Sequence, residues 1–122
     1  MRSQEQRDPV AERVARNESI FREANERIRD VAASMHVSES QLLPFLCECA
    51  DENCTTILKL TGSEYEPVRQ APTLFINAKG HDVSGQGWAR VVDEFERYSV
   101  IETLGDAAEI ASELDPRDGG PR

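Results

Sequence analysis

Residues 45–54 read FLCECADENC and hold all three cysteines of the 122-residue chain. An odd number of cysteines cannot be paired completely by disulfides within one chain. Their spacing, C-x-C-x4-C, predicts instead that the three sulfurs converge. Side chains of a β-strand alternate between its two faces, so Cys47 and Cys49 would point the same way. If ADEN, residues 50–53, closes a hairpin, Cys54 falls opposite Cys49 on that face.

Three converging thiolates repel one another unless a cation lies between them, and Zn²⁺ is the usual cation. Tetrahedral Zn²⁺ binds each sulfur at about 2.3 Å and requires a fourth ligand. We favour His81, because a loop that follows a predicted strand can bend this side chain back toward the hairpin. Asp82 would then orient the imidazole as a hydrogen-bond acceptor. The alternative fourth ligands are His36, Asp51 and Glu52.

The predicted metal ligands are Cys47, Cys49, Cys54 and His81. Other uses of the thiols stay open: Cys47 or Cys49 could form an oxidisable pair with Cys54, or the cysteines could pack as small apolar side chains. An iron–sulfur cluster usually takes four cysteines. A structural zinc site fits the spacing best, and a filled, anionic coordination shell makes zinc a poor Lewis acid.

The sequence contains no nucleophile elbow, phosphate loop or dinucleotide fingerprint. A catalytic zinc would in addition need an open coordination position and nearby groups that move protons. We therefore expect a protein without enzymatic activity.

Residues 9–35 are predicted to form one long amphipathic helix, with Asp8 as its cap and Pro9 at its first position. Two apolar rows at heptad spacing give a seam typical of a coiled coil or a partner-binding helix. The rows are Val14, Phe21, Ile28 and Met35, and Val10, Asn17, Ala24 and Val31. Asn17 favours pairing with a second copy or a partner helix, whereas Ile20 widens the stripe and favours packing on the protein's own sheet. Both readings stay open.

The rest of the chain reads as short strands and two helices. Thr61 and Glu64 form a capping box that opens a short helix to about Gln70, and Pro67 kinks or shortens it. GDAAEIASEL, residues 105–114, forms the last helix. The expected strands are FLCEC (45–49), TTILKL (55–60), TLFIN (73–77), ARVVDEF (89–95) and YSVIETL (98–104). For ARVVDEF, a helical turn is the alternative.

The predicted fold class is α+β: a small, mainly antiparallel sheet with a Cys3His zinc staple, a long N-terminal helix and a short C-terminal helix. With 39% hydrophobic residues, the chain can bury one ordinary core. We expect a disordered tail at residues 1–8, the long helix at 9–35, the zinc-stapled domain at 36–115 and a second disordered tail at 116–122.

The net charge of −9 is unevenly distributed. Residues 1–35 carry seven Arg and seven Asp or Glu, whereas residues 36–122 carry seven Lys or Arg and sixteen Asp or Glu. An acidic body repels phosphate, so nucleic-acid binding is expected only if the Arg-rich helix supplies it. No apolar run approaches the roughly 18 residues of a membrane span, and no apolar leader is visible. We expect a cytoplasmic protein with reduced cysteines.

Several segments, from FLCECADENC through LTGSEYEPVR, LFINAKGH and YSVIET to GDAAEIASELDPR, resemble a family of small, poorly characterised actinobacterial-type proteins. Its members carry F-x-C-E-C-x4-C, L-T-x-x-E-Y and G-H motifs. The resemblance spans roughly residues 16–117 and implies that the three cysteines and His81 belong together. The chain departs from the pattern at Pro67 and in HDVSGQGWARV. The resemblance implies no activity.

The sequence thus predicts a non-enzymatic, zinc-binding regulatory or adaptor protein that acts through protein–protein contacts. Its partner would be an unidentified protein or a second copy bound through the N-terminal helix. The alternatives are a thiol-based redox sensor that releases zinc on oxidation and a nucleic-acid-associated regulator.

Overall fold

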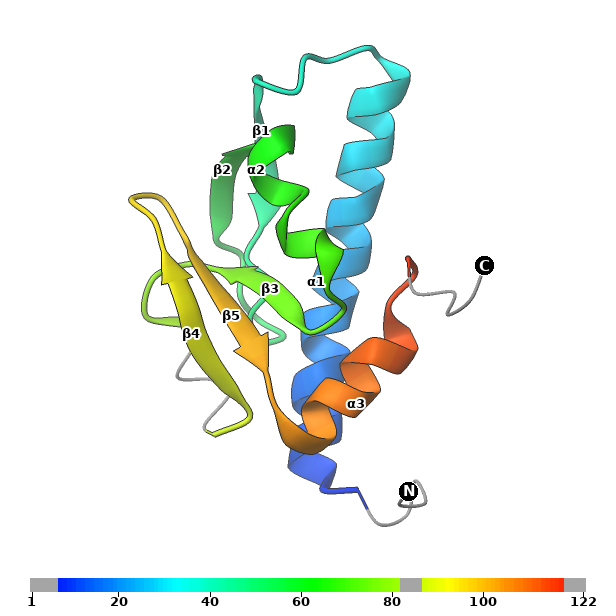
Figure 1. Cartoon of the computed structure of the whole chain (residues 1–122), viewed down its shortest axis with the longest axis vertical. Coiled ribbons are helices and arrows are strands. Elements are labelled where there is room, and N and C mark those ends of the chain that lie inside the picture. The colour runs from blue at the N-terminus through cyan, green and yellow to red at the C-terminus, as the bar shows by residue number, and fades with distance from the viewer. Residues whose placement is uncertain (1–6, 82–86, 118–122) are drawn as a thin grey trace.

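The computed structural model describes residues 7–81 and 87–117. Helix α1 (Pro9–Ser34) runs along the full height of the molecule, and α3 (Gly105–Leu114) packs against its N-terminal half (Figure 1). Asp8 caps α1 by accepting a hydrogen bond from the backbone N–H of Val10 at 2.8 Å. The predicted long N-terminal and short C-terminal helices are confirmed.

Five described strands form two antiparallel sheets. Strand β1 (Leu42–Leu46) pairs with β2 (Ile57–Thr61). Strands β3 (Leu74–Asn77), β4 (Ala89–Glu94) and β5 (Ser99–Thr103) form the second sheet, in the order β3–β5–β4. The predicted α+β class is confirmed, with its small antiparallel sheet divided into two.

The β1–β2 hairpin is placed differently from the prediction. A strand was expected at residues 45–49, but β1 begins at Leu42, includes Pro44 and ends at Leu46. Pro44 is tolerated because a two-stranded sheet has a free edge on each strand, where a missing N–H costs little. The backbone N–H of Cys47 still donates to the Thr56 carbonyl at 3.0 Å, just beyond the paired strands. The cysteines therefore lie in the loop that joins the strands.

The predicted capping box is present at the end of β2. The Thr61 hydroxyl accepts from the Glu64 N–H at 3.1 Å, and the Glu64 carboxylate accepts from the Thr61 N–H at 2.8 Å. It opens α2 (Gly62–Tyr65), which is followed by the 3₁₀ helix η2 (Val68–Gln70). The break between them falls at Pro67, as predicted from the rigid proline ring.

The core lies on both faces of the three-stranded sheet. Phe75 and Ile101 face α1 and α3, where they join a cluster with buried residues of those helices. The neighbouring residues Ile76 and Val100 join a second cluster, which contains Phe45 of β1 and residues of β2, α2 and η2. Adjacent residues of one strand thus serve different clusters, as strand alternation requires.

The face of α1 that packs inside the protein differs from the predicted seam. Val14 is buried and Phe21 and Ile28 are half-buried, whereas Val31 and Met35 are 56% and 69% exposed. Apolar spacing alone could not identify the buried face, because that face mixes polar and small apolar side chains. It consists of Ala11, Val14, Ala15, Glu18, Ser19, Arg22, Asn25 and Ala32. Pairing of the exposed end of the seam with another helix stays a prediction.

Arg7 and Arg117, the first and last residues that the structure describes, each form ion pairs with the rest of the fold. Arg7 pairs with Glu113 of α3, and Arg117 pairs with Glu26 of α1 and with Glu66. Arg7 and Arg117 fall within the segments that were expected to be disordered tails, and that expectation stays a prediction. Residues 1–6 and 118–122 lie outside the described residues. No helix in the part of the chain that the structure describes is long and apolar enough to cross a membrane.

Candidate metal centre

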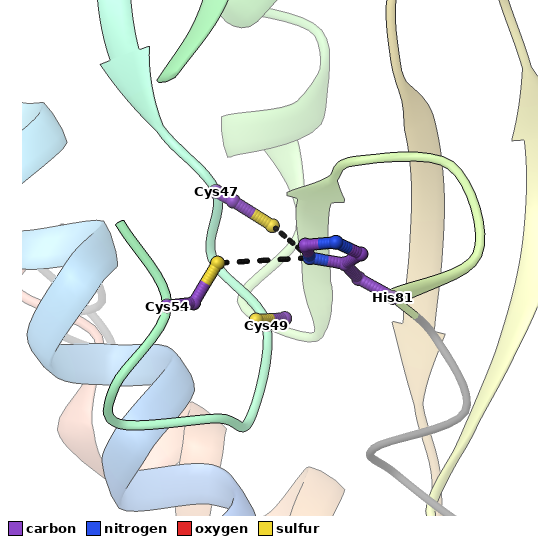
Figure 2. A group of neighbouring side chains, drawn as sticks. All are labelled: Cys47, Cys49, Cys54 and His81. Carbon is purple, nitrogen blue, oxygen red and sulfur yellow. Dashed lines mark hydrogen bonds between the residues drawn. The ribbon is translucent and has the colours of Figure 1, made fainter. Parts of the chain in front are cut away.

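The four predicted ligands lie together between the β1–β2 loop and the segment that follows β3 (Figure 2). One ligating atom from each of Cys47, Cys49, Cys54 and His81 lies within 4.8 Å of all the others. The Nδ1 atom of His81 is 3.4 Å from the Cys47 sulfur and 3.6 Å from the Cys54 sulfur. In a tetrahedron with metal–sulfur bonds of about 2.3 Å and a metal–nitrogen bond of about 2.0 Å, this edge is about 3.5 Å. The group could therefore bind a metal ion, with Nδ1 as the nitrogen ligand.

Local turns bring the sulfurs together without a regular hairpin. The Cys54 N–H donates to the Asp51 carbonyl at 3.0 Å, and the Asp51 carboxylate accepts from the Asn53 N–H at 2.9 Å. These bonds curl the loop so that Cys54 returns toward Cys47 and Cys49. The predicted convergence thus holds, although it arises from a turn rather than from cross-strand pairing.

His81 reaches the cysteines through a tight turn after β3. The backbone N–H of His81 donates to the Ala78 carbonyl at 3.0 Å, and Gly80 within this turn has a φ of 87°. Glycine adopts this conformation without the steric cost that a side chain would add. Ala78 also contributes directly, because its N–H donates to the Cys47 sulfur at 3.1 Å. Such a bond favours the thiolate form that a metal ion requires.

Glu48, between the first two cysteines, anchors the ligand loop in the core. Its side chain is fully buried. The carboxylate accepts from Asn25 Nδ2 at 2.8 Å, from the Tyr65 hydroxyl at 2.5 Å and from the Ile76 N–H at 3.0 Å. Burial raises the pKa of this carboxyl, and the three donors oppose that rise.

The sequence interpretation missed Glu48, although the signal was present. The alternation that aligns Cys47 with Cys49 also turns the residue between them to the opposite side. The Glu48 side chain lies inside the protein because α1, α2 and β3 supply donors to its carboxylate.

Burial and charge suit a cation at this place. Cys47 and Cys49 are each 1% exposed, while Cys54 and His81 are half-buried. The hydrogen bond with Cys47 lowers the pKa of Cys49 to about 5, and the same bond and burial raise the pKa of Cys47. A metal ion would balance the negative charge of a Cys49 thiolate.

The alternative ligands lie outside the cluster. His36, which follows the end of α1 and has a φ of 59°, is exposed. Asp51 and Glu52 are also exposed and do not join the group of converging ligand atoms. Asp82, predicted to orient the imidazole, lies outside the described residues.

A scan against protein-family models, a search of curated proteins and a search of solved structures each find no match. The features described above define a small α+β protein with a Cys3His group that could bind a metal ion. Membership of the actinobacterial-type family stays a prediction.

Proposed function

We propose that this chain is a non-enzymatic, zinc-binding regulatory or adaptor protein. The observation that carries the proposal is the convergence of three sulfurs and one imidazole nitrogen within 4.8 Å. This is the ligand set of structural zinc sites, and four protein ligands leave no open position for a substrate. The metal's role is then to stabilise the fold, and the surface provides contacts with a partner.

Zinc at this site would join the two sheets. Three ligands belong to the loop between β1 and β2, and the fourth follows β3, 27 positions beyond Cys54. Because the four ligands converge only in the folded chain, zinc binds the folded state in preference to the unfolded one. Zinc binding should therefore raise the free energy of unfolding.

Metal analysis tests this proposal. Protein purified without chelator should contain about one equivalent of zinc, and removal of zinc by a chelator should lower the midpoint of thermal unfolding. Less than about half an equivalent, or an unchanged midpoint after chelation, would contradict the proposal.

The two histidines provide a matched pair of variants. His81→Ala removes the proposed nitrogen ligand, whereas His36→Ala removes an exposed histidine outside the cluster. Loss of a direct zinc ligand should weaken zinc binding by at least about tenfold in competition with a chelating dye, and His36→Ala should leave zinc binding unchanged. The reverse result would assign the fourth ligand to His36.

A thiol redox sensor is the second proposal, and the partial exposure of Cys54 favours it. Peroxide could oxidise two of the thiolates to a disulfide, being itself reduced to water, and zinc would then leave. Zinc release by near-stoichiometric hydrogen peroxide, with zinc rebinding after a reductant is added, would support a sensor. Retention of zinc under this treatment would support a purely structural site.

Two further parts of the predicted function belong to the same proposal. A partner protein or a second copy would contact the exposed end of the α1 seam, at Val31 and Met35.

Nucleic-acid binding receives less support, because two arginines of α1 are engaged within the fold. Arg22 is buried, and Arg29 pairs with Glu39 and Glu66.

A further inference from the structure

An apolar groove of about 360 Å³ lies between η2 and strands β4 and β5. Leu74 and Val100 belong to its lining, with Val68 of η2. Val100 packs in the cluster on the face of the three-stranded sheet that α1 and α3 do not cover. None of the four candidate ligands lines the groove, so it is separate from the Cys3His group.

Two large apolar side chains at the groove are partly open to solvent. Val92 lies at the irregularity of β4, between the paired residues Val91 and Asp93, and is 42% exposed. Phe95 is 43% exposed and stacks on Tyr98, with ring centroids 4.9 Å apart. Stacking holds the aromatic ring in one place while its other face stays available. Rigid, partly exposed aromatic residues are typical anchors of protein interfaces.

The charged residues that line the groove are acidic. Its lining includes Glu64 and Asp93 and no cationic residue. Glu64 pairs with Arg97, but within residues 7–81 and 87–117 Asp93 and the exposed neighbours Glu94 and Glu96 form no ion pair. Residues 36–122 supply the whole net charge of −9. A ligand that covers this surface should therefore carry positive charge.

The backbone beside the groove is also available. Strand β4 pairs only with β5 among the described strands, so its outer edge presents unpaired backbone N–H and C=O groups. An extended peptide can add to such an edge and place alternate side chains in a neighbouring pocket.

We propose that this groove binds an extended segment of a partner protein that carries an apolar side chain beside lysine or arginine. The apolar side chain would enter the groove against Phe95, and the cation would lie near Asp93. The inference deepens the adaptor part of the proposed function, and it does not require the metal. A second apolar groove beside α1, lined by Val31 and Met35, carries no such inference because its surroundings do not indicate an occupant.

Two blocked peptides test the proposal on the full-length, zinc-loaded chain. One alternates lysine with leucine and phenylalanine, and the other has glutamate in place of lysine. The lysine peptide should bind saturably at concentrations up to about 1 mM, with amide chemical-shift changes concentrated at residues 92–100. The glutamate peptide should not bind.

Matched substitutions separate the groove from general attraction between opposite charges. Phe95→Ala and Asp93→Lys should each weaken binding of the lysine peptide by about tenfold. Ile20→Ala and Asp30→Lys make the same kinds of change at exposed positions of α1 and should alter the dissociation constant by less than about twofold. All four variants should keep the unfolding midpoint of the unmodified chain to within a few degrees.

Four results would overturn the proposal: no saturable binding, equal binding of both peptides, no weakening by either groove variant, or shift changes concentrated on α1. Concentration-dependent dimerisation through residues 92–100 would also overturn it, because a second copy would then be the occupant. Zinc content is measured on the same samples. Peptide binding by a chain that holds no zinc would contradict the metal site alone, and a zinc-loaded chain without peptide binding would contradict the groove alone.

Discussion

Glu18 of α1 provides a direct test of how burial controls the stability of this fold. Its side chain is 1% exposed, and one carboxylate oxygen accepts from the Thr103 hydroxyl at 2.9 Å. Among the described residues, the other oxygen has no hydrogen-bond partner. Burial raises the pKa of Glu18 from 4.5 to about 8, with the Thr103 bond and nearby Arg22 opposing the rise. The folded protein thus favours the neutral carboxyl.

The direction of the pH dependence follows from this shift. A carboxyl whose pKa is higher in the folded state contributes stability that is fully present below its unfolded pKa, near 4.5, and is lost as pH rises through about 8. The whole shift corresponds to about 5 kcal/mol, of which about half falls between about pH 6 and about pH 8.5. Glu18→Gln has the same shape and cannot ionise. The variant should therefore become more stable relative to the unmodified chain by about 2–3 kcal/mol over that interval.

Guanidinium unfolding followed by circular dichroism, at both pH values and a fixed free zinc concentration, measures this difference. Comparing the two proteins at each pH removes the pH dependence of zinc binding, which both share. Glu23→Gln, the same substitution at an exposed position of α1, serves as the control and should show no such trend. A difference between Glu18→Gln and the unmodified chain that stays constant with pH would refute the reasoning.

Three other substitutions test separate parts of the structure by the same unfolding measurement. Glu48→Ala leaves three buried donors without an acceptor and should lower the free energy of unfolding by about 3–5 kcal/mol, so a loss below about 1 kcal/mol would contradict the anchoring role. Thr61→Ala removes the capping box and should cost about 1 kcal/mol, whereas an unchanged value would mean that α2 does not depend on its cap. Arg69→Met leaves Asp115 buried without its cation and should cost about 3 kcal/mol. Adding Asp115→Asn should recover part of that loss, and additive effects would argue against a coupled pair.

Elements with local signals were predictable from the sequence. The cap at Asp8, the proline after it and the apolar periodicity identified α1 to within one residue at its C-terminal end. The Thr61 capping box and Pro67 identified α2 and its interruption for the same reason, since each acts through neighbouring backbone atoms. Local chemistry is sufficient where the interaction spans only a few residues.

Features that depend on distant residues were not predictable in this way. The first strand was predicted at residues 45–49, yet β1 includes Pro44, which the free edge of the two-stranded sheet tolerates. Arg22 of α1 is buried because the carbonyls of Pro72 and Ala111 accept from its guanidinium, which also lies 4.5 Å from the centroid of the Phe75 ring. No spacing rule within α1 encodes those partners.

The four candidate metal ligands fall between these cases, and the reason bears on what a bound metal would do. Cys47 and Cys49 are brought close by their own spacing. Their position in the fold depends on Glu48, whose carboxylate accepts hydrogen bonds from residues of α1, α2 and β3. We therefore expect the core to shape the loop before an ion binds, so that binding requires less ordering of the chain than in a zinc finger, which is unfolded without metal. Most members of the two apolar clusters are residues other than the four candidate ligands. Removal of zinc should consequently lower the stability of the folded chain while leaving its helices formed, and a chelated protein without helical circular dichroism at low temperature would show that the metal, rather than the core, organises the fold.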